Sequence, residues 1–288
     1  MTALDIPAML SPRALAEVRA HPDFDQVVDR LAAASLAVLA RADETGRWMF
    51  RDLGRSALYV AAVILDTTDS GLTASDLVIA ARAQGAASRG RVMAFLRYAE
   101  SMGEITVPPG GGAWTRRRLQ LAPAFVERLR KGNLLYAAAA AGLFPELAPL
   151  SEKLSSDSYF RRYLLCMGIA SQAIPGAATA PGPGQTLFLN RDRGMSMVFR
   201  WMISQPRPRS RLLEAAALSR SRLSAEFGVS RIHINRLLND ALAMGLIACP
   251  SPDRILFSQT LSDDIEQVLL VTLQITRAAF LFAEASTP

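Results

Sequence analysis

The stretch Leu223-Ser-Ala-Glu-Phe-Gly-Val-Ser-Arg-Ile-His-Ile-Asn-Arg-Leu-Leu-Asn239 decides the fold of this chain. It predicts two short helices joined by a tight turn. Gly228 supplies the positive φ that such a turn needs, and Ser230 is a suitable N-cap for the second helix. In that second helix the apolar side chains share one face, which should be buried, and polar side chains fill the outer face. The outer positions are Arg231, Ile232, His233, Asn235, Arg236 and Asn239.

The run Gly-Val-Ser-x-x-x-Ile-x-Arg-x-Leu-Asn in these residues resembles the helix-turn-helix of bacterial repressors, including the lactose-repressor family. The resemblance implies DNA binding. Side chains of these types reach guanine and adenine edges or phosphates, so the candidate contacts follow from the motif. They are Ser230, Arg231, His233, Asn235, Arg236 and Asn239. The alternative is an amphipathic helical hairpin that binds nothing.

A weaker copy of the same pattern precedes it by 142 residues, with Ser88-Arg89-x-Arg91-Val92 aligned on Ser230-Arg231-x-His233-Ile234. Thr73 should cap its first helix, and the run 84–87 should form the turn. Ser88, Arg89 and Arg91 are the candidate DNA contacts at the start of its second helix.

Each copy is followed by a predicted β-hairpin. After the first copy, 105–107 alternates as a strand, 108–112 is a glycine-rich tip, and 114–121 returns with three arginines. These arginines, Arg116, Arg117 and Arg118, are placed to lie along a phosphate backbone or a minor groove. The second hairpin is shorter and returns through Arg254, which joins the candidate DNA contacts.

A helix-turn-helix followed by a hairpin is the winged-helix layout. The order of elements resembles a tandem winged helix-turn-helix protein, similar to bacterial regulators of the multiple-antibiotic-resistance (MarR-like) type, although two copies in one chain are unusual there. The implied fold is mainly α, with two winged-helix domains joined by a helical linker and flanked by terminal helices. The expected segments are an N-terminal helical segment (1–45), a first winged helix (46–131), a helical connector with a Pro/Gly linker from 175 to 184 (132–195), a second winged helix (196–260) and a C-terminal helix (261–288).

The distribution of charge supports a polyanionic partner. Residues 85–131 carry nine basic and three acidic side chains, and 205–236 carry seven basic and two acidic, while the whole chain has a formal net charge of +6. The remainder is therefore net acidic, and basic side chains gathered into two windows are typical of a surface that meets nucleic acid. The partner that we expect is double-stranded DNA.

Several classes of function are disfavoured. Two cysteines (Cys166, Cys249) and two histidines are too few and too scattered for a metal site, and no catalytic triad or nucleotide-binding glycine motif can be assembled. We therefore expect no enzyme activity, no cofactor and no metal. A Cys166–Cys249 disulfide is the alternative to two free thiols in a reducing compartment. No signal peptide is evident, and the longest uninterrupted apolar run, 134–144, is too short to span a membrane, so a cytoplasmic protein without a membrane partner is expected.

Two alternatives to a transcription regulator stay open: a plasmid-type replication initiator with tandem winged helices, and a winged-helix scaffold that docks an acidic protein. A small-molecule effector bound in the helical middle is also left open. The last helix carries two apolar stripes, one through Ile265 and Leu269 and the other through Val268 and Ile275. A helix that is apolar on two sides should be buried on both, which predicts a homodimer.

Overall fold

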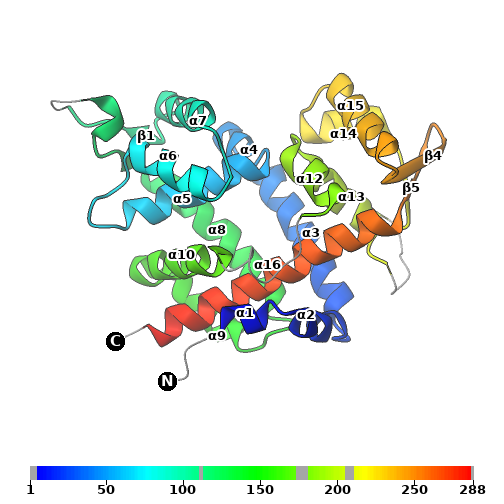
Figure 1. Cartoon of the computed structure of the whole chain (residues 1–288), viewed down its shortest axis with the longest axis horizontal. Coiled ribbons are helices and arrows are strands. Elements are labelled where there is room, and N and C mark those ends of the chain that lie inside the picture. Colours follow the sequence, from blue (N-terminus) through cyan, green and yellow to red (C-terminus); the bar gives the residue numbers. More distant parts are fainter. Residues whose placement is uncertain (1–4, 110–112, 173–180, 205–210, 287–288) are drawn as a thin grey trace.

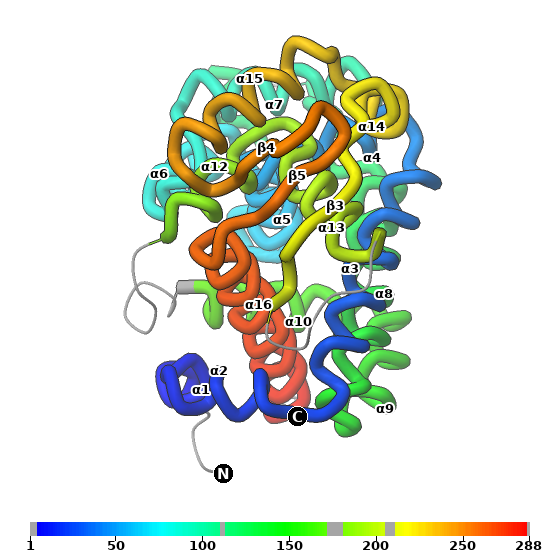
Figure 2. Tube along the Cα trace, turned by 90° about the vertical axis from the view of Figure 1, so that its right-hand side faces the viewer, coloured from blue at the N-terminus to red at the C-terminus, as the bar shows by residue number. Residues whose placement is uncertain are grey.

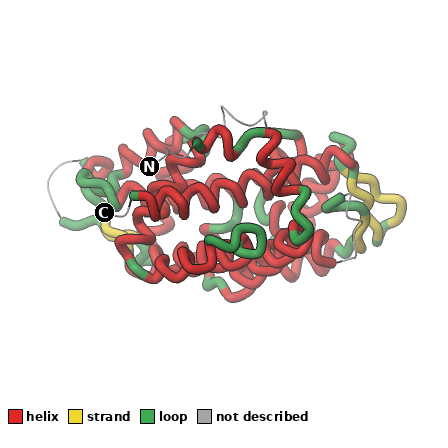
Figure 3. Tube along the Cα trace, turned by 90° about the horizontal axis from the view of Figure 1, so that it is seen from below, coloured by secondary structure: helices red, strands yellow, loops and turns green. Residues whose placement is uncertain are grey.

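The computed structural model describes residues 5–109, 113–172, 181–204 and 211–286. The chain is mainly helical, as expected, and carries two small antiparallel sheets. Figure 1 shows two lobes above a body of longer helices. We call residues 44–121 the first lobe and residues 183–257 the second lobe. Strands occur at the two opposite ends of the long axis, and helices fill the space between them (Figure 3).

The helical body is assembled from the N-terminal, middle and C-terminal parts of the chain. Its elements are α1 (Ile6–Met9), α2 (Pro12–Arg19), α3 (Phe24–Arg41), α8 (Pro123–Ala140), α9 (Leu147–Glu152), η2 (Lys153–Ser155), α10 (Asp157–Gln172) and α16 (Gln259–Ala285). Ser11 caps α2, because its hydroxyl accepts the backbone N–H of Ala14 at 3.3 Å. The helix α3 packs on α8, and α10 packs on α16.

The first lobe has the order helix-turn-helix, then hairpin. Its elements are α4 (Glu44–Met49), α5 (Leu53–Asp66), α6 (Ala74–Ala83), α7 (Arg89–Ser101), β1 (Ile105–Thr106), η1 (Trp114–Arg116) and β2 (Gln120–Leu121). Each of its four α-helices begins at an Asp, Ser or Thr whose side chain accepts a backbone N–H of the first turn. Such caps satisfy amide groups that the helix itself leaves unpaired, so the helix starts are set by the local sequence.

The second lobe repeats this order with a fuller sheet. Its elements are α12 (Pro183–Asn190), α13 (Gly194–Ser204), β3 (Ala215–Ala217), α14 (Arg220–Phe227), α15 (Arg231–Ala243), β4 (Ile247–Ser251) and β5 (Arg254–Phe257). The strand β5 lies between β3 and β4, antiparallel to both. In the first lobe, an isolated antiparallel bridge between Thr73 and Arg118 stands where β3 pairs with β5.

The weak sequence repeat corresponds to a structural one. The helices α7 and α15 have equal lengths and begin 142 residues apart, at Arg89 and Arg231. Gly103 and Gly245, also 142 residues apart, both adopt a left-handed conformation, with φ of 70° and 66°. Glycine is suited to this conformation, which lets the chain leave each helix toward its hairpin.

The two repeats contact each other reciprocally. If α3 to α8 are counted as the first repeat and α10 to α16 as the second, α3 of the first packs on α13 of the second, and α10 of the second packs on α5 of the first. Arg51 and Arg193, again 142 residues apart, meet where the repeats join, because the backbone N–H of Arg193 donates to the carbonyl of Arg51 at 2.8 Å. Reciprocal contacts of this kind indicate an approximate two-fold relation inside one chain.

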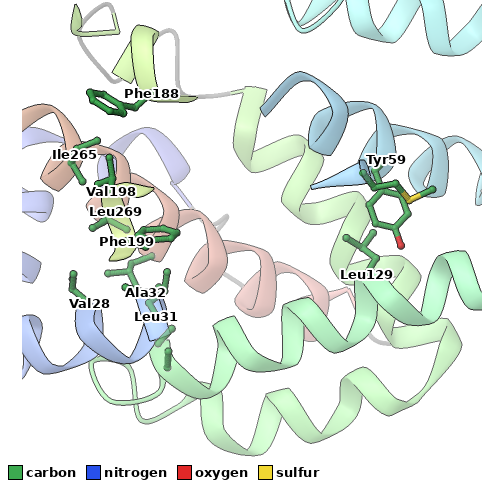
Figure 4. Close-up of a cluster of buried hydrophobic side chains, with 14 of the residues drawn as sticks. Val28, Leu31, Ala32, Tyr59, Leu129, Phe188, Val198, Phe199, Ile265 and Leu269 are labelled. Atoms are coloured by element: carbon green, nitrogen blue, oxygen red, sulfur yellow. The ribbon is translucent and has the colours of Figure 1, made fainter. Parts of the chain in front are cut away.

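One large cluster of buried hydrophobic side chains extends from Leu15 to Ala283 and includes both lobes and the body. Figure 4 shows its central part, where Leu31 of α3, Phe199 of α13 and Leu269 of α16 point toward one another. The five segments expected from the sequence therefore share a common core.

The C-terminal helix α16 accounts for the two apolar stripes without a second chain. It packs on α10, α12, α2, α9, α8 and α1, and residues of both stripes, such as Leu269 and Ile275, are buried. The homodimer stays a prediction, but these stripes no longer argue for it.

The helix α16 is long and apolar enough to cross a membrane. Its most apolar window has a mean hydropathy of 1.6, and 56% of that window is buried within the chain. Burial against its own chain is what the core helix of a folded domain shows.

Some local expectations need correction. The return of the first hairpin is a strand only at 120–121, and Trp114–Arg116 forms a 3₁₀ turn. The end of the expected Pro/Gly linker begins a helix, because Pro183 occupies the first turn of α12, a position that proline favours. The glycine tip at 110–112 and the linker residues 175–180 lie outside the described residues.

Candidate nucleic-acid interface

The turn between α14 and α15 has the predicted geometry. Gly228 is left-handed, with a φ of 63°, and the hydroxyl of Ser230 accepts the backbone N–H of His233 at 3.1 Å. Ile234, Leu237 and Leu238 are buried beneath the helix. The sequence therefore fixes both the start of α15 and the face that it turns to the core.

The opposite face of α15 is exposed and polar. Arg231, Asn235 and Asn239 are each four residues apart, so they lie along one side of the helix, and Arg236 flanks them. Ile232 lies among them and is 63% exposed. This face offers guanidinium and amide donors together with amide oxygens as acceptors, the groups that read base edges in a major groove.

His233 is turned away from that face. It is half-buried, and its Nε2 donates to the carbonyl oxygen of Asp192 at 3.0 Å. This bond, together with an ion pair between Arg191 and Asp240, fastens α15 to the turn between α12 and α13. His233 therefore holds α15 against the turn between α12 and α13.

Arg91 occupies the equivalent position in the first repeat and also contacts the loop before a helix, although its side chain is exposed. Its guanidinium forms an ion pair with Asp52, whose carboxylate is 2% exposed and also caps α5 through the backbone N–H of Arg55 at 2.9 Å. The helix α7 therefore contacts the loop before α5, and α15 contacts the loop before α13. Both residues stay predicted DNA contacts, and the sequence did not indicate these partners because they are distant along the chain.

The exposed side of α7 is less polar than that of α15. Ser88 caps the helix by accepting the backbone N–H of Arg91 at 3.4 Å, and Arg89 is exposed. Arg97 is exposed eight residues later on the same side, aligned with Asn239. The sequence-based set omitted Arg97, although its i+8 spacing from Arg89 was a sufficient signal.

The three arginines of the first wing have different surroundings. Arg116 is exposed, and Arg117 is half-buried. Arg118 lies over Gly71, where an added Cβ would stand 2.2 Å from its Nε, and its backbone bridges to Thr73. Arg116 therefore has the greatest freedom to meet a phosphate.

The second wing is a compact hairpin. Arg254 is exposed at the start of β5 and pairs with Ala217 in register. Arg220, at the start of α14, donates to the carbonyl of Pro252 in the hairpin turn at 3.2 Å. The hairpin and α14 are thus joined by a hydrogen bond beside the exposed Arg254.

The two candidate surfaces lie on one side of the molecule. Figures 1 and 2 both place α7 and α15 at the end opposite the chain termini, with α16 running away from them. The wings lie at opposite ends of the long axis (Figure 3).

The metal-ligating side chains of the described residues are scattered. No group of three or more His, Cys, Asp or Glu side chains among them could hold a metal ion. Cys166 and Cys249 are both free thiols, and burial raises the pKa of Cys166, which lowers its reactivity.

No family model, no curated protein and no solved structure matches the chain.

Proposed function

We propose that this protein is a transcription regulator that binds duplex DNA through two winged helix-turn-helix modules in one chain. The observation that carries the proposal is the placement of α7 and α15. Both helices begin at a Ser cap, both leave basic side chains exposed, and both lie on the same side of the molecule.

The chemistry divides the exposed residues into two roles. On α15, Arg231, Asn235 and Arg236 have donors and acceptors suited to base edges. On the wings, Arg116 and Arg254 lie at the flanks, where phosphates would pass. The first group should set sequence preference, and the second should supply affinity that depends on salt.

The direct test is binding of sheared genomic DNA measured by fluorescence anisotropy at increasing NaCl. The wild-type chain should bind, with log affinity falling linearly against log salt. A double variant, Asn235→Ala with Arg236→Ala, should lose discrimination between a selected sequence and bulk DNA. Arg13→Ala is the control, because this side chain is 90% exposed on α2, in the body away from the lobes. Absence of salt-dependent binding would refute the proposal.

Mapping of bound sites across the genome separates the two DNA-binding roles. Sites at many promoters support a transcription regulator, and one cluster of direct repeats beside an origin supports a replication initiator. A chain that retains an acidic protein but no DNA would instead be a scaffold. Light scattering at micromolar concentration checks the predicted homodimer, since a monomer mass would contradict it.

A further inference from the structure

A cavity of about 370 Å³ lies where the two repeats and the body meet. Its wall comes from α3, the start of α5, α8, the α12–α13 region and α16. Most of the wall is apolar, including Leu31, Phe199 and Leu269, whose convergence Figure 4 shows. The volume falls within the range of small-molecule sites in proteins.

Arginine side chains border one part of this otherwise apolar cavity. Arg51 and Arg193 line it and also line a second, more polar cavity on the other side of the junction. Arg193 is 5% exposed and donates to the carbonyls of Phe50 and Arg47. A buried guanidinium beside an apolar space is costly unless anionic groups compensate it.

The protein compensates this charge only in part. Where the repeats join there are six arginines and four carboxylates: Arg47, Arg51, Arg55, Arg91, Arg191, Arg193, Glu44, Asp52, Asp192 and Asp240. Asp192 is shared by Arg51 at 2.8 Å and Arg55 at 3.6 Å, and Asp52 is shared by Arg55 and Arg91. Burial and the neighbouring Arg51 lower the pKa of Arg193 to about 10. The junction is therefore short of negative charge.

The backbone at this point also favours an anion. Met195 and Ser196 line the cavity in the first turn of α13, where the N–H groups of a helix have no partner within the helix and the helix dipole is positive. Arg193, directly before α13, has a φ of 61° and is the only non-glycine residue with positive φ among those the structure describes. Such conformations are retained most often at functional sites.

We propose that this cavity binds a small organic anion, a carboxylate with an aliphatic body. The carboxylate would lie against Arg51 and the first turn of α13, because a guanidinium and free helix N–H groups are the donors that carboxylates prefer. The hydrocarbon chain would fill the space between Leu31, Phe199 and Leu269, with the hydroxyl pair of Ser35 and Tyr136 in the wall. The inference does not depend on DNA binding.

Octanoate is the probe, and calorimetric titration without DNA is the measurement. Octanoate should bind at one site per chain, and 1-octanol and acetate should each bind at least tenfold more weakly, because each lacks one half of the recognised chemistry. Arg51→Gln should weaken octanoate at least tenfold. Arg200→Gln should leave it unchanged, because Arg200 lines only the other cavity, paired with Glu226.

Gly132 on α8 gives a variant that separates binding from folding. It lines the cavity, and a Cβ added there meets nothing within 4 Å. Gly132→Leu should raise the unfolding midpoint, since glycine is a poor helix former, and should reduce octanoate binding at least tenfold by filling the cavity. Gly132→Ala should raise the midpoint while reducing binding less than Gly132→Leu does.

Three results would overturn the proposal. One is no heat of octanoate binding up to millimolar concentration in the wild-type chain. Another is binding that survives both Arg51→Gln and Gly132→Leu, which would place the ligand elsewhere. The third is equal affinity for octanoate and acetate, which would show an anion site without an apolar part.

Discussion

Asp52→Ala should lower the free energy of unfolding by about 2–3 kcal/mol. The side chain is 2% exposed, caps α5 and forms ion pairs with Arg55 and Arg91. Loss of the cap costs about 1 kcal/mol. Breaking a fully buried ion pair costs about 3–5 kcal/mol, but Arg55 and Arg91 stay 23% and 41% exposed, so water solvates much of the charge left behind. We therefore count about 1–2 kcal/mol for the pairs.

Urea denaturation followed by circular dichroism measures this change, and two further variants test the reasoning. Asp52→Asn keeps a cap acceptor and should cost about half as much. Asp43→Ala removes another N-cap aspartate, of α4, whose side chain is 58% exposed, and should cost about 1 kcal/mol or less. A loss below about 0.5 kcal/mol for Asp52→Ala, or equal losses for Asp52→Ala and Asp43→Ala, would refute the account of a buried junction.

Three other predictions concern the exposed arginines Arg236 and Arg116, the close contact at Gly194 and the raised pKa of Cys166. Arg236→Ala should weaken the free energy of binding to a selected DNA sequence by about 1–3 kcal/mol. Arg116→Ala should weaken binding to all sequences alike and reduce the slope of log affinity against log salt by about 0.9. Anisotropy titrations at several salt concentrations distinguish the two variants. Gly194→Ala should unfold at markedly lower urea, because its Cβ would stand 2.3 Å from the carbonyl oxygen of Phe188. Cys166 should react with iodoacetamide more slowly than an unburied thiol at pH 8, because burial raises its pKa and reduces the thiolate fraction. The difference in rate should shrink as the pH rises further, and mass spectrometry measures the labelling.

Each of these has a plain contrary outcome. Identical salt slopes and identical loss of discrimination for the two arginine variants would contradict the division between base and phosphate contacts. Wild-type stability of Gly194→Ala would mean that the α12–α13 turn adapts to a methyl group. Rapid labelling of Cys166 in the folded chain would show that the packing of α10 against its neighbours does not shield this thiol.

The sequence predicted the parts of the fold that local chemistry sets. Gly228 and Ser230 determine the turn into α15, and Ser88 begins α7, because a left-handed glycine and an N-cap act within a few residues. The strand β3 was missed, since Ala215–Ala217 has no strand pattern of its own and is ordered by pairing with β5. Tertiary pairing, not propensity, makes this strand.

The candidate surface was predictable only on its exposed side. Arg231, Asn235 and Arg236 lie where helical periodicity puts them. Arg91 and His233 lie two positions after Arg89 and Arg231, and their partners Asp52 and Asp192 lie about 40 residues away in sequence, so no local pattern indicated those contacts. The burial of α16 within one chain was likewise invisible, because periodicity shows that a face is apolar without showing what covers it.

The meeting of Arg51 and Arg193 shows what is gained when two-fold related halves belong to one polypeptide. In a symmetric dimer the residue at the axis faces its own copy, so one codon sets both sides of the contact. Here the two positions are encoded separately, and they have diverged in conformation as well as in environment: Arg193 is left-handed and buried, and Arg51 is neither. A mutation can therefore change one of the helices α7 and α15, one hairpin or one side of the central cavity while leaving its counterpart as it is.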